Sequence, residues 1–338
     1  MSEKQIRRQM GVILEGGELS AVEAQELLHS LLTEEGTDLH IVALMAALRM
    51  RSVSVAELEG FRAALLGLCV MLDLDAQNAV DLCGTGGDQK NTFNISTVAA
   101  LTVAACGGRV VKHGNYGFSS ACGSSNVLEA CGLKLTSDAQ LLRRMLEESG
   151  ICFLHAPLFH PALKRASLLR RQFGHRSFFN LLGPLVNPAR PGAHLVGVGS
   201  LEVQRLYAYV LERTAVRFAV VHALDGYDEV SLTGAVRVWG RDCDRQLLPE
   251  DFGGRRLRQE ELAGGASIEE NARLFRQALA GKGTPGQTAV IAANAGLALQ
   301  LLTPDRSLTD AVEEAQEALS DGRALAVFER AANISRGE

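Results

Sequence analysis

The sequence changes character after Leu74, and this change restricts the possible folds more than any other feature. Before it, apolar residues recur at helical spacing, and two capping-box patterns, Ser20 with Glu23 and Ser54 with Glu57, each precede such a run. These patterns predict a small helical domain of about four short helices over residues 1–75.

Beyond Leu74, short β-rich runs alternate with helix-like stretches. The β-rich runs cover residues 79–82, 110–111, 151–154, 195–198 and 218–221, and the helix-like stretches cover 96–105, 137–149, 162–172, 203–213 and 268–280. Alternation of this kind predicts an α/β domain with a mainly parallel central sheet.

A less regular segment interrupts this alternation. Four prolines bracket a basic helix between residues 157 and 188, which indicates an excursion from the sheet. A chain that leaves a sheet and returns often lines a ligand cleft at a domain boundary. The expected domains are residues 1–75 joined by 161–186, and residues 76–160 with 187–338.

Composition narrows the class of protein. The chain has 338 residues, 47% of them hydrophobic and 22% charged, which excludes a disordered chain. Its 34 Lys and Arg against 39 Asp and Glu give a net charge of −5, which argues against a nucleic-acid partner.

The cysteines and the apolar runs bear on location. The seven cysteines form no CxxC pair and fit reduced thiols. The longest apolar run, around residues 63–72, is too short to cross a bilayer. We therefore expect a cytoplasmic protein with no membrane partner.

Four segments carry chemistry, and the first is the glycine-rich turn at residues 81–88, Asp-Leu-Cys-Gly-Thr-Gly-Gly-Asp. Its glycines allow backbone N–H groups to close around an anion just before a helix begins. A plain tight turn is the alternative interpretation. The spacing matches neither a Walker A loop nor a dinucleotide fingerprint.

The second segment is Asn-Ile-Ser-Thr at residues 94–97. Asn94 or Ser96 could cap a helix over residues 98–106. Beside the glycine-rich turn, the same residues would place hydroxyl and amide groups at a positive helix end, which suits a phosphate.

The third segment runs from Lys112 through residues 113–120 and continues with Gly-Ser-Ser at 123–125. A fixed cation and clustered hydroxyls after a strand can hold several oxygens of a phosphorylated ligand. A structural or solvated role is the alternative for each residue taken singly.

The fourth segment, Asp-Gly-Tyr-Asp-Glu at residues 225–229, follows an apolar strand. Such carboxylates often form only a solvated turn. At a strand end they can also hold Mg²⁺ between the protein and substrate phosphates.

Taken together, these segments resemble the anthranilate phosphoribosyltransferase family, and the resemblance runs from the helical region almost to the C-terminus. The matching motifs occur in the family's order and spacing at residues 84–88, 94–97, 112–115, 160–162, 180–184 and 228–229. Each motif alone is weak, but six in register make a chance match very improbable.

The resemblance implies a fold, a reaction and an assembly. The fold is a small helical domain and a larger α/β domain hinged around the active site, in a homodimer joined through the helical domains. The reaction moves the phosphoribosyl group of 5-phosphoribosyl 1-diphosphate (PRPP) to the amino nitrogen of anthranilate, with Mg²⁺ as cofactor and diphosphate as product. It belongs to tryptophan biosynthesis.

The resemblance also implies residue roles. PRPP would be bound by Gly84, Gly87, Asp88, Thr92, Asn94, Ile95, Ser96, Thr97, Lys112, Ser119, Ser120 and Ser124. Magnesium would be held by Ser96, Asp228 and Glu229. Anthranilate would meet Gly84, Asn115, His160 and Arg170. The catalytic set would be His113, Asn115, Arg170, Asp228 and Glu229.

The chain departs from the family pattern at several positions. Tyr116 stands where many members have Arg, Ser125 and Asn126 where many have Ala and Asp, Ala121 where a basic residue is frequent, and Gln89 where Gly is common. The sequence offers no physical account of why these departures are tolerated.

Two other functions remain as alternatives. A pyrimidine nucleoside phosphorylase shares the fold type and the Lys-His sequence, but differs in the glycine-rich turn. A non-catalytic paralogue that binds nucleic acid should carry a Lys and Arg stripe, which the net charge of −5 disfavours.

Overall fold

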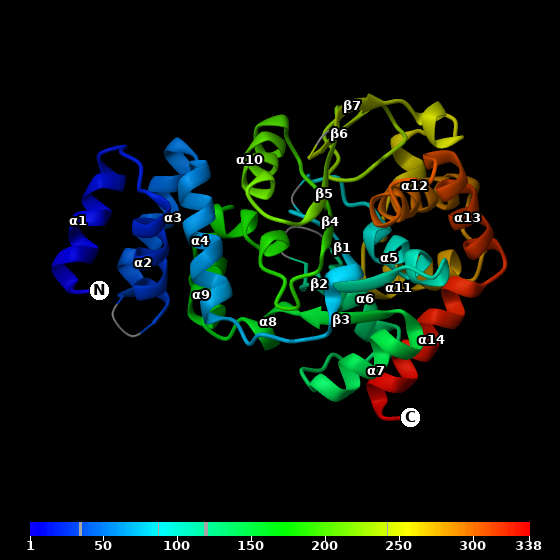
Figure 1. Cartoon of the computed structure of the whole chain (residues 1–338), viewed down its shortest axis with the longest axis horizontal. Helices are drawn as coiled ribbons and strands as arrows, with labels where there is room; N and C mark the ends of the chain where they lie inside the picture. The colour runs from blue at the N-terminus through cyan, green and yellow to red at the C-terminus, as the bar shows by residue number, and fades with distance from the viewer. Residues whose placement is uncertain (34–35, 87, 118–120, 242) are drawn as a thin grey trace. The chain divides into compact units, whose positions relative to one another are not determined.

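The computed structural model describes every residue except 34–35, 87, 118–120 and 242. The chain forms two compact units, residues 1–71 with 156–188 and residues 72–155 with 189–338 (Figure 1). Each unit has its own buried apolar core.

Among its described residues, the smaller unit contains helices and 3₁₀ turns joined by short loops, and no strand. Its α-helices are α1 (Glu3–Leu14), α2 (Ala21–Leu32), α3 (Asp38–Arg51), α4 (Val55–Leu68), α8 (Ala156–Phe159) and α9 (Leu163–Phe173), and its 3₁₀ turns are η2 (Phe178–Leu181) and η3 (Gly183–Leu185). Ser20 and Ser54 cap α2 and α4 in capping boxes with Glu23 and Glu57. The predicted helical region and both predicted caps are confirmed.

A buried ion pair ties this unit together. Glu57 has no exposed surface, and its Oε1 and Oε2 accept hydrogen bonds of 2.5 and 2.9 Å from Arg51. The backbone N–H groups of Leu19 and Ser54 donate to the same carboxylate at 3.1 and 3.0 Å. Burial opposes ionisation of Glu57, but these bonds outweigh it and lower its pKa. Glu57 therefore joins the segment before α2 to the beginning of α4.

The larger unit is built on a seven-stranded sheet of order β3-β2-β1-β4-β5-β6-β7. The strands are β1 (Ala79–Gly84), β2 (Arg109–Gly114), β3 (Ile151–His155), β4 (Ala193–Gly197), β5 (Arg217–Ala223), β6 (Val236–Gly240) and β7 (Cys243–Leu247). The first five strands in this order are parallel, and β6 and β7 add an antiparallel edge. The predicted mainly parallel sheet is confirmed, although the sequence did not indicate β6 and β7.

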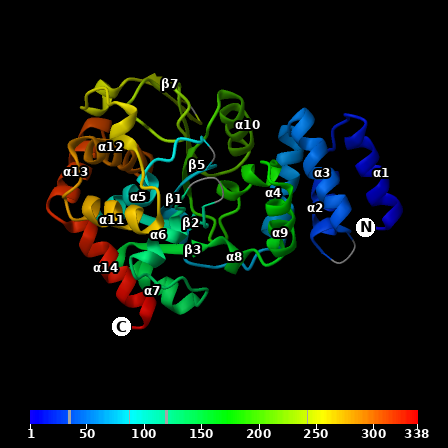
Figure 2. The same cartoon turned by 180° about the vertical axis from the view of Figure 1, so that it is seen from behind.

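Helices cover the sheet of the larger unit. They are α5 (Ile95–Ala105), α6 (Ser124–Ala130), α7 (Ala139–Ser149), α10 (Leu201–Glu212), α11 (Ile268–Leu279), α12 (Pro285–Leu302), α13 (Leu308–Ser320) and α14 (Arg323–Arg336), with 3₁₀ turns η1 (Ala76–Asn78), η4 (Pro249–Phe252) and η5 (Gln259–Leu262). In Figures 1 and 2, α10 and α12 lie on opposite sides of β5. Helices α5 and α12 pack together, and their predominantly buried residues form the core beneath the central strands.

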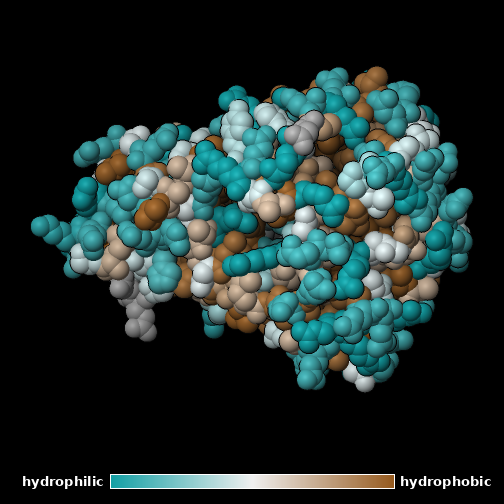
Figure 3. All heavy atoms as spheres, viewed as in Figure 1, coloured by the Kyte–Doolittle hydropathy of each residue, from teal (hydrophilic) through white to brown (hydrophobic). Residues whose placement is uncertain are grey.

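The length and hydropathy of the helices bear on membrane insertion. No helix in the described part of the chain is both long and apolar enough to cross a membrane. Hydrophilic residues cover most of the face drawn in Figure 3.

We predict that Glu57→Gln lowers the free energy of unfolding by about 3 kcal/mol, because it leaves a largely buried Arg51 without its counter-charge. Urea unfolding followed by circular dichroism at pH 7 measures the loss. Glu148→Gln, which breaks the exposed pair with Arg144, is the control and should change stability by less than about 1 kcal/mol.

The lowered pKa of Glu57 also sets a pH dependence. Its contribution is present above the reference pKa of 4.5 and disappears as the pH falls through the lower folded value. Acid should therefore destabilise the wild type more steeply than Glu57→Gln. Parallel pH profiles for the two proteins would contradict this assignment.

Candidate active site

The candidate site begins at the carboxyl ends of β1 and β4, the neighbouring strands at which the strand order reverses. Ligands of open α/β sheets bind beside such a switch point. Gly84 ends β1 and is paired with Gly197 at the end of β4. Two glycines therefore face each other where a ligand is expected.

These glycines make room for Asp228. A Cβ on Gly84 would lie 2.6 Å from Asp228 Oδ2, and a Cβ on Gly197 would lie 1.5 Å from the Asp228 backbone oxygen. Neither position tolerates a larger residue unless the Asp228 segment moves. The glycines thus bring an acidic segment, distant in sequence, against the ends of β1 and β4.

The acidic pair accepts hydrogen bonds from two backbone amides that the sequence analysis associated with phosphate binding. Gly86 N–H donates to Asp228 Oδ2 at 2.9 Å, and Ser96 N–H, at the beginning of α5, donates to Glu229 Oε1 at 3.2 Å. The other oxygen of Glu229, Oε2, is buried and has no hydrogen-bond partner among the described residues. The same amides that would suit an anion are thus occupied by carboxylates.

The electrostatic environment of Asp228 and Glu229 favours the binding of a cation beside them. Burial, and then the charge of Asp88, raises the pKa of Asp228. Burial raises the pKa of Glu229 well above its usual value, and the negative charges of Asp228 and Asp88 raise it further. Ionised carboxylates in this position become more favourable when a positive charge joins them.

The donor set fits magnesium shared with a substrate. Within the described ranges, no cluster of three or more Asp, Glu, His or Cys side chains could hold a metal by itself. Mg²⁺ is commonly held by one or two carboxylates together with water and substrate phosphates. The oxygens of Asp228, Glu229 and Ser96 are of the right type, and the unpaired Glu229 Oε2 is available as a ligand.

Lys112, on β2, is nearly fully buried beside this group. Its Nζ donates to the Leu82 carbonyl and lies 3.4 Å from Ser96 Oγ. Burial lowers its pKa, while Asp81 opposes that effect. The ammonium group therefore lies within the protein next to Ser96.

The residues before and within α5 also gather here. Helix α5 begins at Ile95, earlier than the expected start at residue 98, and the Asn94 side chain does not cap it. Instead, Asn94 Nδ2 donates to the Cys122 carbonyl at 3.0 Å, and its buried Oδ1 has no partner in the described part of the chain. Ile95 and Thr97 are buried, whereas Thr92 is half-buried and forms a β-bridge with Ala263.

The segment after β2 is joined to α6. The Asn115 carbonyl accepts bonds from Ser125 N–H at 3.2 Å and from Ser124 Oγ at 3.3 Å. His113 N–H donates to the buried Asp81 Oδ1 at 3.1 Å. These hydrogen bonds connect the backbone of His113 to β1 and the backbone of Asn115 to the first turn of α6, where Ser124 lies.

His160 and Arg170 belong to the helical unit. His160 Nε2 lies 3.0 Å from the Val186 carbonyl, and burial lowers the pKa of His160 to about 4. The Arg170 guanidinium lies over the Phe179 ring at 5.6 Å, and burial lowers its pKa to about 10. An arginine held in this way keeps its charge at neutral pH.

Three predicted PRPP-binding residues, Gly87, Ser119 and Ser120, lie outside the described residues. The small pocket at the ends of β1 and β4 is lined by Gly84, Ser96, Asp228 and Glu229 of the predicted set.

The sequence analysis missed Asn294, which lines the same pocket from α12. Its side chain accepts from Val230 N–H at 3.1 Å and donates to the Val230 and Val290 carbonyls, each at 2.8 Å. Asn294 therefore fixes the backbone directly after the acidic pair. Its sequence signal is a single amide within the otherwise apolar stretch of residues 289–299.

The chain matches two family models along most of its length. Residues 12–69 match the helical bundle domain of the glycosyl transferase family, and residues 76–325 match its α/β domain. The protein is thus a member of this glycosyl transferase family.

Individual relatives show to which group within the glycosyl transferase family the chain belongs. Anthranilate phosphoribosyltransferase of Christiangramia forsetii is 45% identical over 94% of this chain and 96% of its own, and that of Cytophaga hutchinsonii is 46% identical over 93% and 95%. The solved structure of the Thermus thermophilus enzyme superposes with a TM-score of 0.90 at 36% identity, over 97% of this chain and 99% of its own. The chain belongs to the anthranilate phosphoribosyltransferases.

A ligand-bound structure bears on the cofactor. The Saccharomyces cerevisiae anthranilate phosphoribosyltransferase in complex with PRPP and Mg superposes with a TM-score of 0.91 at 25% identity, over 100% of this chain and 99% of its own.

The two alternatives, a pyrimidine nucleoside phosphorylase and a nucleic-acid-binding paralogue, are not favoured by these relatives.

We predict that Gly197→Ala destabilises the protein by about 1–3 kcal/mol, because the new methyl group overlaps the Asp228 backbone. Thermal unfolding measures the effect. Gly199→Ala, two residues along the chain, is the matched control, since its Cβ would meet Asp88 only at an ordinary 3.8 Å. Equal melting temperatures for both variants would contradict the close approach of Asp228 to β4.

Proposed function

We propose that this protein transfers the phosphoribosyl group of PRPP to the amino nitrogen of anthranilate, releasing diphosphate. The proposal rests chiefly on one observation: the carboxylates of the acidic pair accept hydrogen bonds from the Gly86 and Ser96 backbone amides at the switch point. Membership of the anthranilate phosphoribosyltransferases supplies the substrates. The product enters tryptophan biosynthesis.

The PRPP site, in this proposal, uses backbone amides and hydroxyl groups around the end of β1. The amides of Gly86 and Ser96 already bind carboxylate oxygens, so their geometry suits anionic oxygens. A phosphate oxygen reaches either amide only when the carboxylate on it turns away. Donor binding is therefore coupled to a rearrangement of Asp228 and Glu229.

Magnesium would be held by Asp228, Glu229 and Ser96, and when bound it supplies positive charge beside the departing diphosphate. Lys112 contributes a second, fixed positive charge next to Ser96 Oγ. The unpaired Asn94 Oδ1 can accept a hydrogen bond from a ribose hydroxyl.

Arg170 is proposed to bind the anthranilate carboxylate, with Asn115 and His160 beside the acceptor. The Phe179 ring and the surrounding protein hold the guanidinium in place, which reduces the entropy lost on binding a carboxylate. His160 is neutral at pH 7 because its pKa is about 4, so it adds no competing charge.

The chemistry needs no nucleophilic side chain. The C1–O bond to diphosphate breaks, the anthranilate nitrogen forms a bond to C1, and the nitrogen releases a proton. An aromatic amine is already neutral at pH 7, so the protein mainly orients it and excludes water. We assign this task to His113 in β2 and to Asn115 directly after it, and the assignment is supported by the hydrogen bonds of their backbone to Asp81 and Ser125.

The direct test is the loss of anthranilate fluorescence when PRPP is added to the purified protein. The proposal expects a decay that depends on both PRPP and magnesium. Phosphorolysis of thymidine or uridine without that decay would instead support a nucleoside phosphorylase.

We predict that Asp228→Asn combined with Glu229→Gln strongly reduces turnover and abolishes its dependence on magnesium concentration, because both metal-binding charges are lost. Melting temperature should not fall, since burial opposes both charges. Steady-state kinetics across a magnesium titration provide the measurement. An unchanged magnesium profile in the double variant would refute the metal role.

For Arg170→Ala we expect an increase in the anthranilate KM that corresponds to a loss of about 1.5–3 kcal/mol, the size of a charge-assisted hydrogen bond. The KM for PRPP should stay constant. Arg171→Ala, at an exposed position on the same helix, is the control and should behave as the wild type. An effect confined to the PRPP KM would show that Arg170 does not bind anthranilate.

Assembly and location extend the proposal. Exposed Leu14, Val22, Leu39 and Met50 give the helical unit apolar side chains that a second copy could cover, which supports a homodimer joined through this unit. Sedimentation velocity tests the homodimer, and a monomer at micromolar concentration would refute it.

All seven cysteines are free, which supports a reducing, cytoplasmic location.

A further inference from the structure

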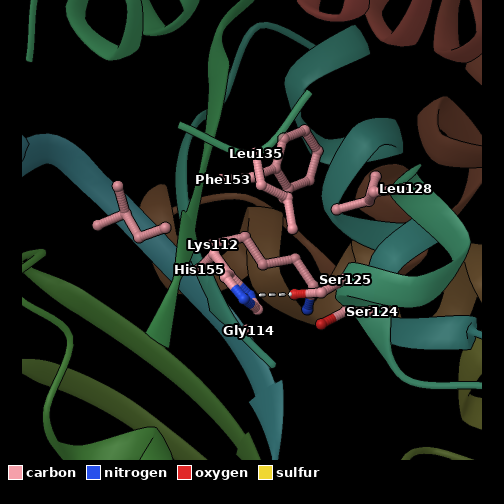
Figure 4. A pocket seen from close by; sticks show the side chains of 9 residues that line it. Lys112, Gly114, Ser124, Ser125, Leu128, Leu135, Phe153 and His155 are labelled. Atoms are coloured by element: carbon pink, nitrogen blue, oxygen red, sulfur yellow. Dashed lines mark hydrogen bonds between the residues drawn. The ribbon is translucent and has the colours of Figure 1, made fainter. Parts of the chain in front are cut away.

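Three side chains from separate segments meet beside the predicted Asn115 segment. His155 ends β3 and Ser125 lies in the first turn of α6 (Figure 4), and Tyr116 follows Asn115 in the chain. His155 Nδ1 lies 2.8 Å from Ser125 Oγ. The rings of His155 and Tyr116 pack edge to face, with 4.6 Å between their centroids. We call His155, Ser125 and Tyr116 the His155 cluster.

The hydrogen-bonded pair of His155 and Ser125 is buried, whereas the third member of the cluster, Tyr116, is 45% exposed. Ser125 is 2% exposed and His155 is 5% exposed. A buried hydroxyl that loses its partner costs about 1–3 kcal/mol, so the bond between these side chains favours one arrangement of α6 relative to β3. Figure 4 shows this bond among side chains that line a pocket together with Lys112 and Ser124.

Backbone bonds extend the cluster to Asn115. Ser125 N–H donates to the Asn115 carbonyl at 3.2 Å, and Tyr116 N–H donates to Asn115 Oδ1 at 2.8 Å. His155 thus contacts one residue that bonds to the Asn115 backbone and another that bonds to its side chain.

The cluster also accounts for departures from the family pattern. Tyr116 and Ser125, two of the unusual residues, share His155 as a neighbour. Asn126, a third, accepts hydrogen bonds from Gly117 N–H and Gly123 N–H, each at 3.0 Å. Tyr116, Ser125 and Asn126 therefore take part in neighbouring contacts of the same segment. Nothing in the structure explains Ala121 and Gln89.

We propose that His155 is a positioning residue, which acts through Ser125 and Tyr116 to hold Asn115 and the beginning of α6 in the arrangement that binds the substrates. The inference rests on the proposed function, because Asn115 and Ser124 are placed in the substrate site by that proposal. It adds His155, to which the sequence analysis gave no role.

The test compares His155→Phe, Ser125→Ala and the double variant. His155→Phe keeps the ring beside Tyr116 and removes the bond to Ser125. We expect each single variant to lower kcat/KM for anthranilate about five- to tenfold, the equivalent of one hydrogen bond. The double variant should be no worse than the poorer single variant, because both changes remove the same interaction.

A conservative variant and a control separate positioning from folding. His155→Asn keeps a hydrogen-bonding group at the position of Nδ1 and should recover most of the loss seen in His155→Phe. Ser149→Ala removes another buried hydroxyl, bonded to Met145 O in α7, and should leave the kinetics unchanged. Multiplicative losses in the double variant, no rescue by asparagine, or wild-type kinetics in His155→Phe would overturn the inference.

Amide hydrogen exchange distinguishes failure of this inference from failure of the proposed function. Without substrates, His155→Phe and Ser125→Ala should speed exchange at Tyr116 and Ser125 at least threefold, as expected when a bond of about 1 kcal/mol is lost. Unchanged exchange there would overturn the positioning role. If the wild type shows no transferase activity, the proposed function fails, while this exchange comparison still decides whether His155 holds the segment.

Discussion

The close approach of Asp228 to Gly84, through its carboxylate, and to Gly197, through its backbone, is the contact on which the site depends. The ends of two parallel strands would normally leave space for side chains, but glycines at both positions leave it to an acidic segment. Asn294 forms two hydrogen bonds with the backbone of Val230, the residue directly after the acidic pair. A pair of carboxylates is thereby buried next to backbone amides, where the charges are unfavourable without a compensating cation.

This arrangement links the fold to the reaction. An anion site made of amides and a cation site made of carboxylates share the same few atoms, so neither is independent of the other. In the proposed mechanism, a ligand that carries both phosphate and magnesium satisfies the amides and the carboxylates together. The buried Lys112 adds a fixed charge whose position is set by Leu82 and Ser96.

Local signals predicted much of the molecule. The caps at Ser20 and Ser54 depend on residues three apart, and the parallel strands are short apolar runs, so both could be read from the sequence. Strands β6 and β7 were missed because β6 alternates buried with half-buried residues and β7 is largely exposed, so no continuous apolar run marks either strand. The contacts of Asn294 and His155 were missed because they join segments 64 and 30 residues apart. The roles of the predicted site residues in binding stay predictions.

The most direct measurement of the central claim is a crystal structure of the protein with PRPP and magnesium. The account predicts phosphoryl oxygens on the Gly86 and Ser96 amides, with the Asp228 and Glu229 carboxylates turned from those amides to the metal. Carboxylates still bonded to both amides, with the diphosphate bound elsewhere, would contradict it.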